Sequence, residues 1–450
     1  MLPEIPPGPP FFKWGNFRLE ISVNHDQEWE VHMSINGIMA EFADEAAFLW
    51  FLRARAVGAP HFSLDDLATL DERIEAHIDG LRIAGEAGWD ICEGTLGSED
   101  PEKYFAPSVI AFESGMTPRI QAILDSIGKK PSKACALISA LGWLPLAQAE
   151  PHIRNLLASE SPFHRYLGIA ASAIHRRDPG HLLGKTVDDG LPILTARSLR
   201  AYGELGRSRE LDSRILRAGL SNGDDGIRFS AAWSATLAGK QEAVDMLKSF
   251  VLPKSPHREE ALNTALRRME QAAALSWQRH LAQSLDTIRL AVMGSGIIGD
   301  PALIPWLMER MKTPELARVA GEAFTMITGV DVDQEVMRDT QPKGFNAGPT
   351  DDPGDVNVAM DPDDYLPWPN VEAVLHWWNR NKGAFPSGIR HLLGKPITVV
   401  NLRNILRSGR QRQRAAAALE LAILEPERPL FEVRARGVRQ MEVLWMKDEL

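Results

Sequence analysis

Apolar residues recur every three or four positions from about Asp44 onward, the spacing of one face of an α-helix. Between residues 281 and 330 three apolar stripes follow one another. Their members are Leu281, Leu285, Ile288 and Val292, then Ile304, Leu307, Met308 and Met311, then Leu316, Val319, Ala320, Ala323, Phe324 and Ile327. No single helix pair of this kind buries its apolar face alone, so neighbouring pairs are expected to stack. Small Ala and Gly residues on the stripes should let the paired helices approach closely.

Short breaks in this helical pattern recur at a regular interval. Each precedes an apolar helix start, and they are Thr117-Pro118, Glu150-Pro151, Asp178-Pro179, Arg209-Glu210, Lys240-Gln241 and Asp300-Pro301. The offsets between their first residues are 33, 28, 31, 31 and 60, the last being about two periods. Asp or Glu caps a helix, and proline at the first helical position needs no N–H. The pattern predicts an all-α, α-α solenoid.

The first 40 residues have a different pattern, because apolar and polar residues alternate over 17–35. The alternating apolar residues are Phe17, Leu19, Ile21 and Val23, then Trp29, Val31, Met33 and Ile35. Alternation of this kind is typical of a β-hairpin. We therefore expect a short N-terminal hairpin extension, which would be absent from the native protein if Met39 were the start.

These patterns divide the chain into five regions. They are 1–40, the tail and hairpin; 41–114, an N-terminal helical region; 115–330, the repeats; 331–369, an acidic Pro/Gly-rich loop; and 370–450, C-terminal helical repeats and a tail. The second region contains the capping-box pair Ser63 and Asp66. Its acidic row of Asp71, Glu75 and Asp79 is interpreted as a solvated helix face.

The acidic loop and the region after it carry two further expectations. Residues 331–369 contain ten acids and two bases, so we expect mobility over 333–362 when no partner is bound. Their acids lack the ligand spacing of an EF-hand, which argues against calcium. A last helical pair is expected over 398–424. The pentapeptide HLLGK occurs at 181–185 and again at 391–395, which suggests that the C-terminal part descends from the same repeat.

Particular segments resemble known repeat proteins. GIIGDPALIPWLMERM, followed by PELARVAGEAF, resembles the short HEAT-like repeat of about 30 residues, and the resemblance covers roughly 115–330. SLDDLATLDERIEAHIDGLRIAG, SPFHRYLGIAASAIHRRDPG and YLPWPNVEAVLHWWNRNKGAF together resemble an uncharacterised proteobacterial family of HEAT-like proteins. Some members of that family occur beside type VI secretion genes. The resemblance implies a HEAT-like α-α solenoid and a role in a bacterial secretion or effector system.

Composition narrows the class of protein further. Apolar residues make up 44% of the 450 residues, so the chain can bury a sizeable core. Two cysteines exclude a disulfide framework, and the charge-free stretch that includes 134–148 is too short for a bilayer. The start of the chain lacks the basic and apolar regions of a signal peptide. We expect a cytoplasmic protein without membrane insertion. The net charge of −10 argues against binding of the whole molecule to nucleic acid.

No catalytic constellation is visible in the sequence. Residues 294–299 read G-x-G-x-x-G, but the Asp300-Pro301 pair that follows would break the helix a dinucleotide site needs, so the glycines are expected to form a tight turn between helices. The histidines form no HExxH and no His-Glu dipeptide, so the iron site of HEAT-repeat deoxyhypusine hydroxylases is not carried over. The C-terminal KDEL is interpreted as coincidence. The sequence leaves enzymatic activity open and favours a non-catalytic protein without cofactor or metal.

The candidate partner site is an arginine run in NLRNILRSGRQRQR, which contains no acid. Its members are Arg403, Arg407, Arg410, Arg412 and Arg414, and the aromatic candidates Trp368 and Trp377 lie beside the acidic loop. Alternatives are a solvated face, or an internal match to the first hundred residues, whose charge is −13. Trp378 is expected in a helix core. We expect Arg407, Arg410 and Arg414 to be replaceable by Glu without loss of the fold.

Two functions from different classes follow. The first is a non-catalytic scaffold or adaptor whose solenoid groove binds another protein. The alternative is a nucleic-acid-binding or DNA-repair protein on a HEAT-like scaffold. That alternative needs Lys and Arg converging on the groove, with an aromatic residue and a carboxylate beside them.

Overall fold

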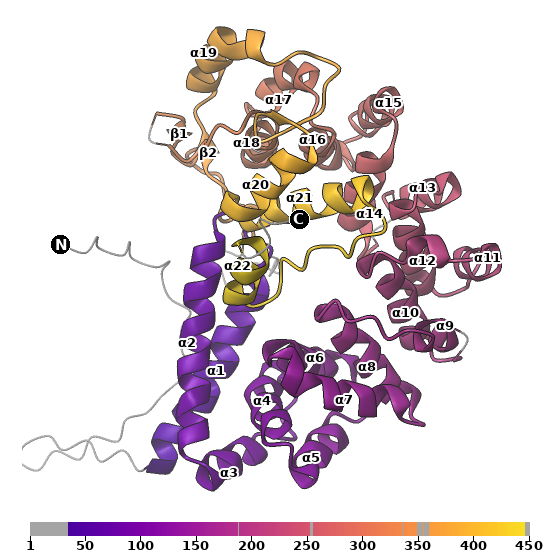
Figure 1. Cartoon of the computed structure of the whole chain (residues 1–450). Coiled ribbons are helices and arrows are strands. Elements are labelled where there is room, and N and C mark those ends of the chain that lie inside the picture. The colour runs from indigo at the N-terminus through magenta and orange to yellow at the C-terminus, as the bar shows by residue number, and fades with distance from the viewer. Residues whose placement is uncertain are drawn as a thin grey trace, which may run out of the picture.

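The computed structural model describes residues 35–187, 189–252, 255–334, 336–348, 354 and 360–445. Over these residues the chain is an all-α helical-repeat solenoid of twenty-two α-helices, with two pairs of two-residue strands (Figure 1). The fold class predicted from the apolar periodicity is therefore confirmed. The predicted hairpin over 17–35 lies outside the described residues, except for Ile35, with which the first helix begins.

The even-numbered helices from α4 to α18 form a continuous inner row, because each packs against the next even-numbered helix. They are α4 (Phe105–Ser114), α6 (Pro131–Trp143), α8 (Pro162–Ile174), α10 (Pro192–Glu204), α12 (Asp225–Leu237), α14 (Arg258–Arg268), α16 (Ile288–Ile298) and α18 (Pro314–Thr328). Successive members start 26 to 33 residues apart. The predicted period of about 30 residues is confirmed.

The outer row lies at the periphery of the molecule (Figure 1). It consists of α5 (Thr117–Ile127), α7 (Leu146–Ala158), α9 (Leu182–Val187), α11 (Ser213–Leu220), α13 (Gln241–Ser249), α15 (Gln271–Leu281) and α17 (Ile304–Arg310). Short 3₁₀ turns separate some elements: η1 (Pro101–Tyr104), η2 (Ser208–Glu210), η3 (Pro301–Leu303) and η4 (Lys382–Ala384). The apolar core lies between the two rows.

Only some of the predicted helix starts are correct. Helices begin at Thr117 and at Gln241, as expected. Pro151 instead lies inside α7, which begins directly after Pro145, so the predicted start was five residues late. No helix begins at 178–179, and 209–210 lie in η2, while α11 begins after its N-cap Asp212. The inner helices therefore keep their spacing of about 30 residues even where a helix begins at a residue other than the predicted one.

Small residues allow the inner helices to approach closely, as expected. A Cβ on Gly203 of α10 would lie 2.4 Å from the Trp233 ring of α12. A Cβ on Gly296 would lie 2.9 Å from the Ala323 Cα of α18. The G-x-G-x-x-G segment was expected to be a turn, but Gly296 lies within α16. Only Gly299, with φ +75°, ends the helix in the left-handed conformation that favours glycine.

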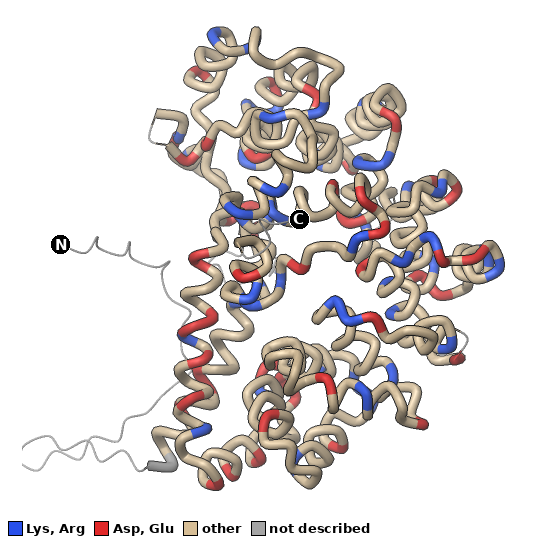
Figure 2. Tube along the Cα trace, viewed as in Figure 1, with Lys and Arg blue, Asp and Glu red and all other residues tan. Residues whose placement is uncertain are grey.

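The first helices stand beside the repeats and form a long antiparallel pair (Figure 1). They are α1 (Ile35–Ala56) and α2 (Leu64–Ile83), followed by the shorter α3 (Glu86–Gly94). The predicted capping box is confirmed: the Asp66 N–H donates to the Ser63 Oγ at 3.1 Å, and the Ser63 N–H donates to the Asp66 carboxylate at 2.8 Å. The acidic row of α2 is visible in Figure 2, but its member Asp71 is buried and paired with Arg53, so the solvated face was wrong there.

The C-terminal region leaves the path of the repeats. Its elements are β1 (Arg338–Asp339), β2 (Trp368–Pro369), α19 (Val371–Asn381), β3 (His391–Leu392), β4 (Lys395–Pro396), α20 (Val399–Ser408), α21 (Gln411–Leu424) and α22 (Gly437–Trp445). The helices α20 and α21 confirm the predicted last pair. Because α21 packs on α14 and α22 packs on α2, this region crosses the space enclosed by the repeats and closes the solenoid into a ring (Figure 1).

The acidic loop is anchored at both of its ends. β1 pairs antiparallel with β2. Near the second strand the Asp361 carboxylate pairs with Arg318 at 2.6 Å, and the Asp363 carboxylate pairs with Arg289 at 2.6 Å. We predicted mobility over 333–362. Within that range, residues 335, 349–353 and 355–359 lie outside the described residues.

Candidate functional site

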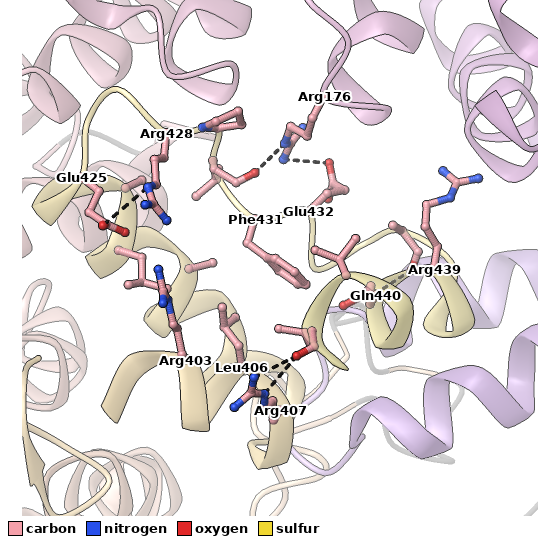
Figure 3. Close-up of a pocket in the computed structure, with 18 of the residues that line it drawn as sticks. Arg176, Arg403, Leu406, Arg407, Glu425, Arg428, Phe431, Glu432, Arg439 and Gln440 are labelled. Carbon is pink, nitrogen blue, oxygen red and sulfur yellow. Dashed lines mark hydrogen bonds and ion pairs between the residues drawn. The ribbon is translucent and has the colours of Figure 1, made fainter. Parts of the chain in front are cut away.

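A cavity of about 850 Å³ lies inside the ring, between α20, α21, the end of α8 and residues 425–445. Residues 425–445, comprising a non-helical stretch and α22, are called the strap below. Five arginines and two glutamates line the cavity (Figure 3): Arg176, Arg403, Arg407, Arg428, Arg439, Glu425 and Glu432. Apolar side chains from α20, α21 and the strap form the rest of its wall. The site therefore combines an excess of positive charge with an apolar surface.

Two of these guanidinium groups are available to a ligand. Arg403 on α20 is half-buried and has no hydrogen-bond, ion-pair or ring partner among the described residues. Arg428 on the strap is exposed, and its Nε lies 3.6 Å from the Glu425 carboxylate, a distance too long for a strong charge-assisted hydrogen bond. Figure 3 places both side chains on the same wall.

The other three arginines hold the strap in place. Arg176 donates to the Leu430 carbonyl and pairs with the Glu432 carboxylate at 3.1 Å. Arg407 donates to the Leu444 carbonyl from Nε at 3.1 Å and from Nη2 at 2.9 Å. These contacts use donors that a ligand would otherwise take, so the two groups of arginines have different roles.

Arg439 and His175 form the boundary of the cavity toward α6. Arg439 donates to the Leu144 carbonyl at 2.8 Å, and burial lowers its pKa. The His175 Nε2 lies 2.8 Å from the Leu141 carbonyl, and its Nδ1 lies 3.4 Å from an Arg439 nitrogen. Burial lowers the pKa of His175, which the nearby Arg439 charge lowers further. The ring is therefore neutral near pH 7.

The rest of the predicted arginine run serves the fold. Arg410 donates to the His61 carbonyl at 2.5 Å. Arg412 donates to the Gly58 carbonyl at 2.8 Å and to the Glu322 carboxylate at 2.9 Å. The expected internal match to the first hundred residues thus exists, but the acceptors there are backbone carbonyls and not acidic side chains.

Arg414 is fully buried, so it offers no surface to a partner. It donates to the Leu406 carbonyl at 2.7 Å, to Gln411 at 3.1 Å and to Gln440 at 2.5 Å. Burial lowers its pKa to about 10. A glutamate at this position would meet the same acceptors without a donor. The expectation that Arg414 is replaceable by Glu without loss of the fold therefore conflicts with its surroundings.

The predicted tryptophans do not line the cavity. Trp368 in β2 lies under the Arg318 guanidinium, 4.7 Å from its ring centroid. Trp377 on α19 packs edge-to-face on Phe324, with ring centroids 5.7 Å apart. Trp378 is buried, as expected from its stripe. Arg403 and Arg407 are thus the members of the predicted set that line the cavity.

Sequence reasoning missed Arg176, Arg428, Arg439 and Phe431. A signal was present, because the segment 428–439, RPLFEVRARGVR, contains four arginines and one glutamate among apolar residues. They are Arg428, Arg434, Arg436 and Arg439, and the repeats add Arg176 to the cavity. No pattern in the sequence places Arg176 beside them.

Two observations on the described residues concern metal binding and thiol reactivity. Within them no group of three or more His, Cys, Asp or Glu side chains could hold a metal ion. Burial raises the pKa of the Cys92 thiol to about 12, so that thiol is protonated near pH 7 and a poor nucleophile. In the same part of the chain, no helix has the length and apolar character needed to cross a membrane.

Comparison with known proteins adds no relative: no family model matches the chain, and no curated protein matches it significantly.

Proposed function

We propose that this protein is a non-catalytic scaffold that binds another protein at the arginine-rich cavity inside the ring. The observation that carries the proposal is the pair Arg403 and Arg428, two guanidinium groups to which the described residues offer no strong acceptor, in a cavity of about 850 Å³. Arginine is suited to carboxylates and to backbone oxygens, which a polypeptide supplies. The volume lies in the range of pockets that hold a small molecule or a short chain segment.

The closed ring changes how such a scaffold would work. An open solenoid presents its whole concave face to a partner. Here the strap occupies that face, with the Leu430 N–H donating to the Glu204 carbonyl of α10 at 2.9 Å. A partner would therefore insert a segment into the cavity, and a folded domain would not lie along the groove.

The cellular context is part of the proposal. The repeats resemble HEAT-like repeats, and three segments of the chain resemble a proteobacterial family of which some members occur beside type VI secretion genes. On this resemblance we propose that the partner belongs to a bacterial secretion or effector system. We also propose a cytoplasmic location, which is the expectation from the sequence.

Site-specific photo-crosslinking in the native cell tests this function. Phe431, which lies in the cavity (Figure 3), is replaced by p-benzoylphenylalanine. The matched control carries the same group at Leu285, which is exposed and does not line the cavity. We expect a defined protein to crosslink at 431 and not at 285. Crosslinking to no protein at 431, or equally at both positions, would contradict the scaffold.

A second candidate, nucleic-acid binding, is favoured by one observation. The cavity brings arginines together with the aromatic Phe431 and the carboxylates Glu425 and Glu432, the residue types that a repair-type site needs. Against it, Arg176 already pairs with Glu432, and the strap crosses the space that a duplex would need. The net charge of −10 also repels a polyanion. We therefore rank it second.

A further inference from the structure

We propose that the cavity binds an acidic, partly apolar segment of the partner polypeptide, with a carboxylate held by Arg403 and Arg428 and an apolar side chain held by Val400 and Val443. The inference rests on the proposed function and names the chemistry that the partner presents. It is carried by three features of the cavity: its free charge, its exposed apolar wall, and the way in which the ring already holds a peptide segment.

The free charge selects an anion. Arg403 is half-buried, and its guanidinium has no partner among the described residues, so its donors can bind an acceptor that enters the cavity. Arg428 faces the same space, and its contact with Glu425 is long and solvated, with the two side chains 60% and 28% exposed. A ligand carboxylate placed between Arg403 and Arg428 would gain two charge-assisted contacts and displace only this weak pair.

The apolar wall selects an anion that carries an apolar group. Val400 and Val443 line the cavity and are 69% and 42% exposed, although both are large apolar side chains. Phe431 lies between the arginines of the cavity (Figure 3). Covering these side chains removes apolar surface from water, which an inorganic anion or a phosphate backbone would not do. A peptide with acidic and apolar side chains uses both parts of the wall.

The strap shows how this ring binds polypeptide. Arg176 takes the Leu430 carbonyl and the Glu432 carboxylate, and Arg53 donates to the carbonyls of Arg434 and Ala435, at 3.0 Å each. Guanidinium groups thus bind main-chain oxygens and one acidic side chain of a non-helical segment. Arg403 and Arg428 offer the same chemistry to a second segment, this time from another protein.

A random octapeptide library displayed on phage tests the inference without knowledge of the partner. The full chain is the bait, and enriched peptides are synthesised with a fluorescein label for anisotropy titration. We expect enriched sequences to combine Asp or Glu with Val, Leu, Ile or Phe. Exchange of the acids for Asn or Gln should raise Kd about tenfold for each acid lost, the scale of one charge-assisted hydrogen bond.

Variants assign the binding to the two arginines. Arg403→Gln and Arg428→Gln should each raise Kd about tenfold. Arg154→Gln, an exposed arginine on α7 that does not line the cavity, is the matched control and should leave Kd unchanged. Glu425→Gln removes the competing carboxylate and should lower Kd. Circular dichroism of each variant confirms that it is folded, and Arg403→Lys, which keeps the charge, replaces Arg403→Gln if that variant is not.

The following outcomes overturn the inference. They are enrichment of no acidic peptide, binding that is indifferent to both arginines, or displacement of the labelled peptide by single-stranded DNA that binds more tightly than the peptide. Failure of the inference and of the proposed function are distinguishable. If a protein crosslinks at position 431 equally well in the Arg403→Gln and Arg428→Gln variants, the proposed scaffold function holds, but the inference that its partner presents an acidic segment is wrong. If acidic peptides bind through the two arginines but no protein crosslinks in the cell, the inferred binding site holds and the proposed scaffold function is wrong.

Discussion

Arg53 of α1 and Asp71 of α2 form a buried ion pair whose remaining hydrogen-bonding groups hold the strap. The Arg53 Nη1 and Nη2 donate to the carbonyls of Arg434 and Ala435, and the Gly437 N–H donates to the Asp71 carboxylate at 2.7 Å. A pair that joins the first two helices therefore also joins them to the last one. Removing either partner would leave a buried charge and several backbone groups unsatisfied.

Asp71→Asn should lower the free energy of unfolding by about 3 kcal/mol, because Arg53 would remain buried without its counter-charge. Urea denaturation followed by circular dichroism measures the change. Glu72→Gln, an exposed neighbour on the same helix, is the control and should stay within about 0.5 kcal/mol of the parent. Trypsin should also cut the strap of the Asp71 variant faster. Equal stability of the two variants would show that the pair does not hold the ring.

Arg414→Glu should destabilise the protein by about 3 kcal/mol or more, because it places a carboxylate beside the Leu406 carbonyl in a fully buried site. Arg403→Glu, eleven residues away in the same run, should cost less than about 1 kcal/mol since Arg403 has no partner to lose among the described residues. Denaturant titration of both variants is the measurement. A stable, soluble Arg414→Glu protein would contradict the buried position.

Gly296→Ala should destabilise the solenoid by about 1–3 kcal/mol, because the new methyl would meet the backbone of α18 at Ala323. Gly294→Ala is the matched variant in the same helix. Its methyl would lie 3.0 Å from a flexible Leu266 methyl group, so the effect should be smaller. Thermal denaturation compares the two. Addition of NAD should leave the melting temperature of the parent unchanged, since a ligand that binds the folded state raises it.

Acidification from pH 7 to pH 5 should weaken the fold in part through His175. Burial lowers the pKa of His175 below the ordinary value of 6.5, so the unfolded chain takes up this proton at a higher pH than the folded chain. The stabilisation is present above about pH 6.5 and is lost as the pH falls below it. His175→Gln should flatten this part of the curve of unfolding free energy against pH. His376→Gln, exposed on α19, is the control; an identical change in both variants would exclude His175 as the cause.

Nucleic acid should bind no more tightly than about 10⁻⁶ M at physiological salt, the tight end of the non-specific range. A gel shift over a series of salt concentrations, with duplex DNA and with RNA, measures this. Tight binding that weakens steeply with salt and disappears in the Arg403→Gln and Arg428→Gln variants would favour the second candidate function.

The repeat architecture could be predicted because it depends on local pattern. Each inner helix carries its own apolar stripe, and the next helix supplies the surface that covers it, so a period in the sequence becomes a period in space. The pentapeptide HLLGK shows where local pattern fails. At 181–185 its last four residues form the beginning of α9, whereas at 391–395 it forms a hairpin in which Leu393 and Gly394 have φ of +50° and +75°. The residue after the second copy is Pro396, whose missing N–H cannot continue a helix.

The candidate site was predictable only in part, for a related reason. Arg403 and Arg407 stand four residues apart on one face of α20, which helical spacing indicates. Arg410 and Arg412 turn away because their acceptors are the carbonyls of His61 and Gly58, about 350 residues earlier in the chain. Every residue has a carbonyl, so no residue type in the sequence marks these two as acceptors. The closure of the ring also uses backbone carbonyls as acceptors, so no pattern of residue types in the sequence predicts it.

That closure also has a consequence for synthesis. Helix pairs of the solenoid depend on near neighbours, so they can form as soon as they leave the ribosome. Asp71 must wait for Gly437, 366 residues later, before its last hydrogen bond exists. At translation rates of about 5–20 residues per second this interval lasts on the order of tens of seconds. During this interval the nascent chain exposes the surface of α2 that α22 later covers. A chaperone that binds this surface would therefore bind the incomplete chain and would find the surface covered once the ring has closed.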